Sequence, residues 1–166
     1  MRAFTEAVIS YTGAAKIDVI SHSMGVSLGR RVIKGGQVNA AALPFNLGPS
    51  LSNMVDTYIG IAGANWGLVN CYLAPFIPTC NVLNGFYPGY AIGPMGMSTY
   101  LTELNNNQIR EGSHIYSLFS VMDDLISYGD IVYGRYTSVW PTVDAQKVYD
   151  FDINCHMKLR DDTASV

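Results

Sequence analysis

The order of apolar and polar residues predicts two helices and a strand near the start of the chain. Residues 2–12 carry apolar side chains at a helical spacing, and a glycine follows as a stop. The positions concerned are Phe4, Ala7, Val8, Tyr11 and Gly13. Residues 17–20 form a short β-branched run that favours a buried strand. A second helical pattern extends from residue 24 to about residue 34 and ends at two glycines.

The rest of the chain continues this alternation. Residues 55–61 and 114–119 predict two more strands, and residues 147–151 predict a further extended piece. Ser98 is an N-cap candidate for a short helix over residues 99–104. Residues 37–54 look irregular, and residues 62–97 form a long segment rich in Gly, Pro, Asn and aromatic residues. The order predicts a single α/β domain over residues 1–166 with a mostly parallel sheet.

Composition and charge remove several classes of function. Hydrophobic residues make up 49% of the chain and charged residues 14%, a globular rather than a disordered composition. The net charge is −3, and no basic cluster is longer than Arg30-Arg31, so we expect no nucleic-acid partner. No apolar run approaches the ~20 residues of a membrane-spanning helix. Glu6 interrupts any apolar stretch at the start, so residues 1–6 do not resemble a signal peptide.

The three cysteines bear on the compartment. Cys71 and Cys80 bracket a short Pro-rich loop, a spacing that suits a disulfide in an oxidising compartment and equally suits two unrelated thiols. Cys155 is the odd one, which in a secreted protein hints at a missing partner.

The strongest chemical signal is a predicted strand that turns into a helix at Ser23. The residues are Ile17-Asp18-Val19-Ile20-Ser21-His22-Ser23-Met24-Gly25. A nucleophilic serine at such a turn needs small residues two positions before and after it, and Ser21 and Gly25 meet that demand. The turn directs Ser23 into a crevice and leaves the Met24 amide free to bind an oxyanion. The alternative is an ordinary helix start capped by Ser21 or Ser23.

A serine nucleophile needs a base, and three histidines compete for the role. His22 lies inside the turn with its side chain directed away from the Ser23 hydroxyl, and His114 opens a predicted strand at the wrong end. His156 lies in a predicted loop after the last extended piece. It satisfies the chain order of nucleophile, acid and histidine that is expected where a nucleophilic serine lies at such a turn.

The acid should follow a strand between Ser23 and His156. Four aspartates qualify: Asp123 and Asp124 just after the strand at 114–119, and Asp130 and Asp144 further on. Spacing does not separate Asp123 from Asp124. No pattern of metal-binding residues and no phosphate-binding glycine loop is present, so we expect neither a metal nor a cofactor.

Longer stretches resemble the class 2 triacylglycerol lipases, closest to their nematode branch, which is related to small bacterial extracellular lipases. The similar stretches lie at residues 16–30, 61–68, 84–89 and 129–138. The resemblance implies an α/β-hydrolase fold, secretion of the full-length protein and hydrolysis of carboxylic esters. By motif, Ser23 matches the nucleophile, Asp123 the acid and His156 the histidine, with Asp124 as a neighbour of the acid.

The family pattern also extends beyond this sequence. The resemblance implies earlier strands and a second oxyanion donor before Ser23, so we expect a C-terminal fragment with its N-terminal strands missing. We expect the isolated chain to be a poor esterase.

The preferred hypothesis is a lipase or esterase of lipid catabolism that works through an acyl-enzyme. Its partners would be a lipid or small ester substrate and, transiently, a lipid interface. The alternative is a truncated, non-catalytic hydrolase-like protein or binding remnant. Residues 66–97 would wall an acyl pocket, act as a lid, or simply pack.

Overall fold

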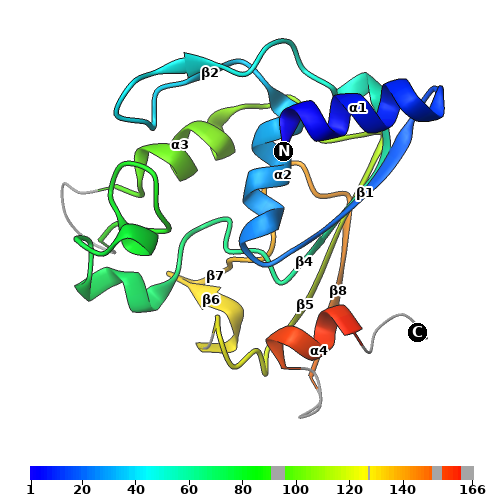
Figure 1. Cartoon of the computed structure of the whole chain (residues 1–166). Coiled ribbons are helices and arrows are strands. Elements are labelled where there is room, and N and C mark those ends of the chain that lie inside the picture. The colour runs from blue at the N-terminus through cyan, green and yellow to red at the C-terminus, as the bar shows by residue number, and fades with distance from the viewer. Residues whose placement is uncertain (91–95, 127, 151–154, 162–166) are drawn as a thin grey trace.

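Four parallel strands form the central sheet of the computed structural model, which describes residues 1–90, 96–126, 128–150 and 155–161. The strands are β1 (Ile17–His22), β4 (Val55–Ile61), β5 (His114–Ser120) and β8 (Ala145–Tyr149), in that spatial order (Figure 1). All three pairings are parallel. The prediction of an α/β fold with a mostly parallel sheet is therefore confirmed. Phe151, the expected end of the last strand, lies outside the described residues.

Helix α2 (Met24–Lys34) lies against one face of the sheet, with the bounds that the sequence predicts. Its Val26 and Ile33 are buried among residues of β4 and β5, including Tyr58 and Ile115. Close packing depends on glycines in and after β4, because a Cβ atom at Gly60 or Gly63 would come within 2.8 Å of the Val26 side chain. Larger residues there would push the helix, and the turn that precedes it, away from the sheet.

A buried cluster of charges holds α2 to the rest of the molecule. Arg30 pairs with Glu111 at 2.8 Å, and Lys34 approaches the same carboxylate at 3.2 Å. Arg30 also donates to the side-chain oxygens of Asn65 and Asn105. Burial lowers the pKa of Arg30 and of Lys34, against the opposing attraction of Glu111. Burial alone would raise the pKa of Glu111, but the two cations outweigh it and the pKa is lowered.

Helix α1 (Arg2–Thr12) ends at Gly13 as predicted, with a φ of 61°, but it buries a different face from the one expected. Phe4 and Tyr11 are 74% and 93% exposed, whereas Ile9 is buried. The contacts of the helix explain the difference. Arg2 donates to the carbonyl of Val32, and Ile9, two turns later, lies on the same side of the helix, opposite Phe4 and Tyr11.

Helix α4 (His156–Asp161) lies on the other face of the sheet, near the carboxyl ends of the strands (Figure 1). Leu159 packs there with Ile61, Ile126 and Tyr149. The expectation that His156 lies in a loop is wrong, because His156 is the first residue of this helix. The Asp124 carboxylate accepts the His156 amide at 2.9 Å, which satisfies a donor that a helix start leaves free.

The segment between β4 and β5 contains short helices. They are η2 (Val69–Leu73), η3 (Pro78–Cys80) and α3 (Thr99–Asn106). The Ser98 hydroxyl caps α3 as predicted, and α3 extends two residues beyond the predicted end. Cys71 and Cys80 form a disulfide, which decides between the two interpretations of their spacing.

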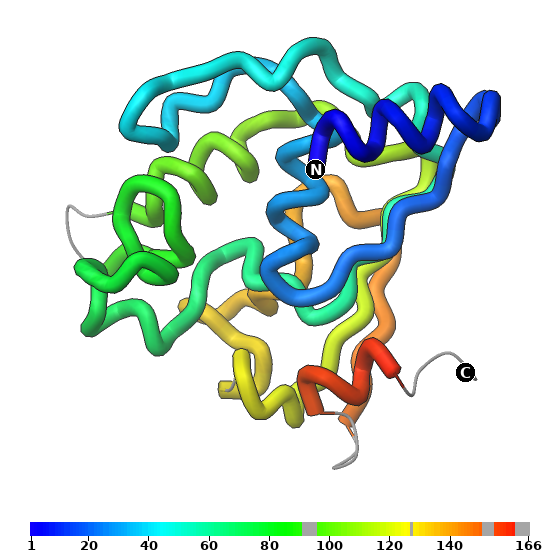
Figure 2. Tube along the Cα trace, in the orientation of Figure 1, coloured from blue at the N-terminus to red at the C-terminus, as the bar shows by residue number. Residues whose placement is uncertain are grey.

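Small elements complete the chain path that Figure 2 traces. The region expected to be irregular contains the hairpin of β2 (Gln37–Val38) and β3 (Phe45–Asn46), followed by η1 (Ser52–Met54). After β5 come η4 (Tyr128–Asp130) and the hairpin of β6 (Ile131–Val132) and β7 (Arg135–Tyr136).

Candidate active site

Ser23 occupies the sharp turn between β1 and α2. Its φ of 56° and ψ of −131° are a conformation that a non-glycine residue adopts only under strain. Two backbone hydrogen bonds hold it: the Ser23 amide donates to the Ile61 carbonyl at 2.8 Å, and the Val26 amide donates to the Ser23 carbonyl at 3.0 Å. The turn is thereby anchored to both β4 and α2. Ser23 makes no side-chain capping hydrogen bond, so the alternative of an ordinary helix start capped by the Ser23 hydroxyl is excluded.

The close approach of strand and helix lies one turn further along than expected. A Cβ atom at Gly25 would meet no atom within 4 Å, so the steric demand placed on Gly25 by the sequence argument is wrong for this structure. At Gly29 a Cβ atom would lie 2.7 Å from the Tyr58 hydroxyl and 2.9 Å from the Ser21 hydroxyl. The side chain of Ser21 points at the second turn of α2, where Gly29 leaves room for it. The close approach of strand and helix therefore needs small residues at positions 21 and 29.

The Met24 amide stands at the start of α2. As the first helical residue, Met24 has an N–H that no carbonyl of its own helix can reach. The helix dipole adds partial positive charge at this end. A negatively charged oxygen beside Ser23 would accept a hydrogen bond from the Met24 N–H and would be attracted by the positive end of the helix dipole.

Asp123 and His156 are in direct contact. The Oδ2 atom of Asp123 lies 2.7 Å from Nδ1 of His156, and both side chains are almost fully buried. The other oxygen, Oδ1, accepts the amides of Leu125 at 2.9 Å and Ile126 at 2.7 Å. These two amides fix the carboxylate in the turn after β5, so its second oxygen is directed at the imidazole.

The contact with Asp123 leaves the other ring nitrogen of His156 as a free base. Because a carboxylate accepts the Nδ1 proton, neutral His156 carries its lone pair on Nε2. Nε2 is buried and has no hydrogen-bond partner within the described part of the chain, so the Ser23 hydroxyl does not reach it in this structure. Serine–histidine hydrogen bonds of unliganded hydrolases are often long and tighten only with substrate.

The backbone of His156 is held as well as its ring. Its amide donates to Asp124 and its carbonyl accepts from Nε2 of His22 at 2.8 Å. The His22 and His156 rings lie 4.6 Å apart between centroids. His22 is the residue before Ser23, so this pair joins the serine turn to α4. From the sequence, His22 was a candidate only for the base, and its contact with His156 was not predicted.

The remaining sequence candidates, Asp144, Asp130 and His114, make no hydrogen bond to Asp123 or His156 in the described part of the chain. Asp144 forms an exposed ion pair with Arg110 at 2.7 Å. Asp130 is buried and accepts the Ser138 hydroxyl at 2.7 Å; burial raises the pKa of Asp130 to about 7. His114 is exposed at the opposite end of β5 from Asp123.

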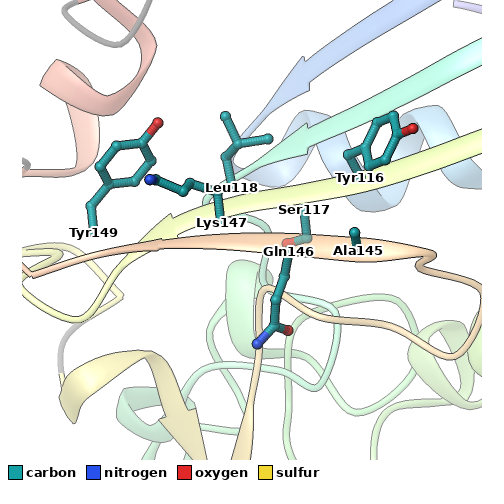
Figure 3. A pocket seen from close by; sticks show the side chains of 7 residues that line it. All are labelled: Tyr116, Ser117, Leu118, Ala145, Gln146, Lys147 and Tyr149. Carbon is teal, nitrogen blue, oxygen red and sulfur yellow. The ribbon is translucent and has the colours of Figure 1, made fainter. Parts of the chain in front are cut away.

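One hollow lies beside α2 and another beside the central sheet. The first, of about 370 Å³, is lined by apolar side chains of α2, including Met24 and Leu28, together with Phe86 from the segment after β4. The other, of about 390 Å³, crosses β5 and β8 (Figure 3). Figure 3 shows Tyr116 and Lys147 there, and none of its lining residues is a candidate for the chemistry. Of these two, the hollow beside α2 is the one whose lining includes Met24, the residue that follows Ser23.

A parallel sheet with a strained serine between strand and helix, and an Asp–His pair at the carboxyl ends of its strands, is the arrangement of α/β-type hydrolases. The family model for lipase (class 2) matches residues 1–166, so the chain belongs to the class 2 lipase family. Its activity class is accordingly hydrolysis of lipids or other esters. The comparison with curated proteins found no match. Among the described residues, no helix is long and apolar enough to span a bilayer.

Proposed function

We propose that the protein hydrolyses carboxylic esters through an acyl-enzyme formed on Ser23, with His156 as the base and Asp123 as its orienting acid. The observation that carries the proposal is the buried His156 ring, which is bound to Asp123 through Nδ1, has an unpartnered Nε2 and lies 4.6 Å from the ring of His22, the residue before Ser23. A merely structural histidine would use both nitrogens or expose one to water.

The chemistry follows from these positions. Ser23 Oγ attacks the ester carbonyl carbon while Nε2 of His156 takes the hydroxyl proton. The resulting oxyanion accepts a hydrogen bond from the Met24 amide, and the Asp123 carboxylate stabilises the imidazolium. Collapse expels the alcohol, which receives the proton from Nε2. Water, deprotonated by the same nitrogen, then releases the acid and regenerates Ser23.

A phosphonate ester probe with a p-nitrophenol leaving group tests this proposal directly. We expect stoichiometric release of p-nitrophenol and an adduct that peptide mass mapping locates on Ser23. Ser23→Ala should abolish both, while Ser27→Ala, a buried serine one turn along α2, should not. An adduct on another serine, or no reaction in a folded protein, would favour the non-catalytic alternative.

We further propose that the protein is secreted and acts in lipid catabolism. The Cys71–Cys80 disulfide supports secretion, because such bonds persist in oxidising compartments. Membership in the lipase family supports a lipid substrate.

Contact with a lipid interface would use the segment after β4. Residues 57–102 contain no charged side chain and no histidine. Leu73 and Phe76 are 81% and 80% exposed on the loop that the disulfide closes. Apolar side chains on a rigid, uncharged loop suit partial insertion between lipid headgroups. The loop leaves the carboxyl end of β4, the edge of the sheet on which Ser23 and Asp123 also lie.

The double variant L73Q/F76Q tests the interface proposal, with Leu43→Gln as a control of similar exposure, 83%, on the β2–β3 hairpin. We expect binding to phosphatidylcholine vesicles and hydrolysis of emulsified tributyrin to fall at least about tenfold in the double variant. Hydrolysis of dissolved p-nitrophenyl butyrate should stay unchanged. Equal losses in the control would show that the loop has no special role.

A further inference from the structure

We infer that His22 is a positioning residue for the reaction: its Nε2–H holds the backbone carbonyl of His156 and so fixes the base relative to Ser23. The inference rests on the proposed function, because it concerns the same base. It assigns a role to a side chain that takes no part in proton transfer.

The hydrogen bond to the His156 carbonyl determines which ring nitrogen of His22 carries a proton. A backbone carbonyl can only accept, so Nε2 of His22 must carry a proton to make the 2.8 Å contact. A neutral His22 ring therefore has its lone pair on Nδ1, pointing away from the contact. The bond persists whether the ring is neutral or charged, which makes it a permanent link.

Three contacts then determine where His156 lies. Its ring is held through Nδ1 by Asp123, its amide by Asp124, and its carbonyl by His22. The first two partners both belong to the turn after β5. Of these three contacts, the third alone comes from the serine turn, so it is the one that ties the base to the element that carries the nucleophile.

Position along the chain makes this link short. His22 is the last residue of β1 and Ser23 follows directly. Ser23 is itself fixed by its amide bond to Ile61. Any displacement of α4 away from the serine turn must therefore break the His22 bond or separate the two rings, which lie 4.6 Å apart. A serine–histidine distance that must tighten with substrate depends on such a restraint.

His22 lies beside the His156 ring, which becomes positively charged when it accepts the serine proton, and a neutral His22 favours this step. Burial lowers the pKa of His22, the hydrogen bond to the His156 carbonyl opposes this, and the charges of His156 and Arg160 lower it further. The Asp123 carboxylate acts in the opposite direction. His22 is therefore neutral near neutral pH and adds no repulsion when His156 accepts the serine proton.

Two variants separate the hydrogen bond from the ring contact. His22→Gln keeps an N–H donor at the end of a side chain of similar reach, and His22→Phe keeps the ring without the donor. The same two substitutions at exposed His114 serve as controls. Thermal unfolding is recorded for all four, and His22→Leu replaces the phenylalanine variant if that variant does not fold.

The first readout is the rate of Ser23 phosphonylation together with kcat and KM for p-nitrophenyl butyrate. We expect His22→Phe to lose up to about 10²-fold in both rates with little change in KM, and His22→Gln to stay within about threefold of the parent. The His114 variants should match the parent. Equal rates for His22→Phe and the parent, or equal losses in both His22 variants, would overturn the inference.

The second readout needs no turnover. The Nδ1 proton shared by His156 and Asp123 gives a low-field proton NMR signal when it is shielded from exchange. We expect this signal in the parent and in His22→Gln, and its broadening or loss in His22→Phe. An unchanged signal in His22→Phe contradicts the inference. A failure of the proposed function, in contrast, would be seen as an unreactive Ser23 in the parent.

Discussion

At the scale of single residues, the two neighbouring aspartates can be told apart by what they hold. Asp123 contacts the imidazole of His156, whereas Asp124 accepts a hydrogen bond from the backbone amide of His156. We predict that Asp123→Asn lowers kcat by about 10⁴-fold, the loss seen in a protease when an asparagine at this place favours the wrong tautomer. Asp124→Asn keeps an oxygen acceptor for the amide, so it should cost less than about tenfold.

The measurement is kcat for a soluble ester with both variants at equal concentrations of folded protein. Active-site titration with the phosphonate probe corrects for inactive material. A larger loss in Asp124→Asn than in Asp123→Asn would reverse the two roles.

Residue types and chain order were enough to select Ser23 and His156, whereas Asp123 was chosen over Asp124 only through the resemblance to the family motif. The structure brings Asp123 and His156 into direct contact. Residue types and chain order could not show that His22 binds the His156 carbonyl, because that contact joins residues 134 positions apart. Nor could they show that Gly29 rather than Gly25 receives the strand side chain. Both depend on how α2 and α4 lie on the sheet, which no local pattern contains.

At the scale of elements, strong local patterns predicted well and short ones did not. The strand Val55–Ile61 and the helix Met24–Lys34 have the predicted bounds, because a β-branched run and a glycine stop define them locally. The hairpin of β2 and β3 was missed, since two residues per strand carry no period. Helix α4 was missed because its start depends on Asp124, which is distant in sequence.

The disulfide is the clearest constraint on an element without regular periodicity. Cys71 and Cys80 are nine residues apart and close the loop that carries Phe76. We predict that C71S/C80S lowers the free energy of unfolding by roughly 2–3 kcal/mol, mainly because the open chain gains freedom when unfolded. Urea denaturation of the two proteins measures the difference.

Peptide mapping without reductant supplies the control for this prediction. It should recover residues 71 and 80 as one linked pair and Cys155 as a free thiol, the state that the structure describes. Free thiols at all three positions in secreted material would show that the disulfide does not form. Unchanged stability in the double variant would show that the disulfide does not stabilise the fold.

At the scale of the whole molecule, the α/β class followed from the order of elements, but the polar interior did not. Arg30 and Lys34 lie on a helix whose sequence would ordinarily expose its cations. Their partner, Glu111, lies in the segment that leads into β5, and Asn65 and Asn105 come from two further segments. Such a cluster forms only when distant segments meet, so it is visible in the structure alone.

Replacement of Glu111 tests how far this cluster supports the fold. Glu111→Gln leaves two buried cations without a counter-charge, and we predict a loss of roughly 3–5 kcal/mol in the free energy of unfolding. The matched control is Glu6→Gln, which breaks the i,i+4 pair of half-exposed Glu6 with Arg2 and should cost no more than about 0.5 kcal/mol. Similar losses in the two variants would mean that the buried cluster contributes little.

The charge of Glu111 also predicts the direction in which stability changes with pH. Because the pKa of Glu111 is lowered in the folded protein, its contribution is present above the unfolded value of about 4.3 and disappears as the pH falls through the folded value. Urea midpoints measured from pH 7 down to pH 3 should therefore decline more steeply below about pH 4.3 in the parent than in Glu111→Gln. The variant has no carboxylate to protonate at this position, so the stability difference between the two proteins should narrow with acid. A constant difference over the whole range would show that Glu111 supports the fold through its shape and hydrogen bonds rather than through its charge.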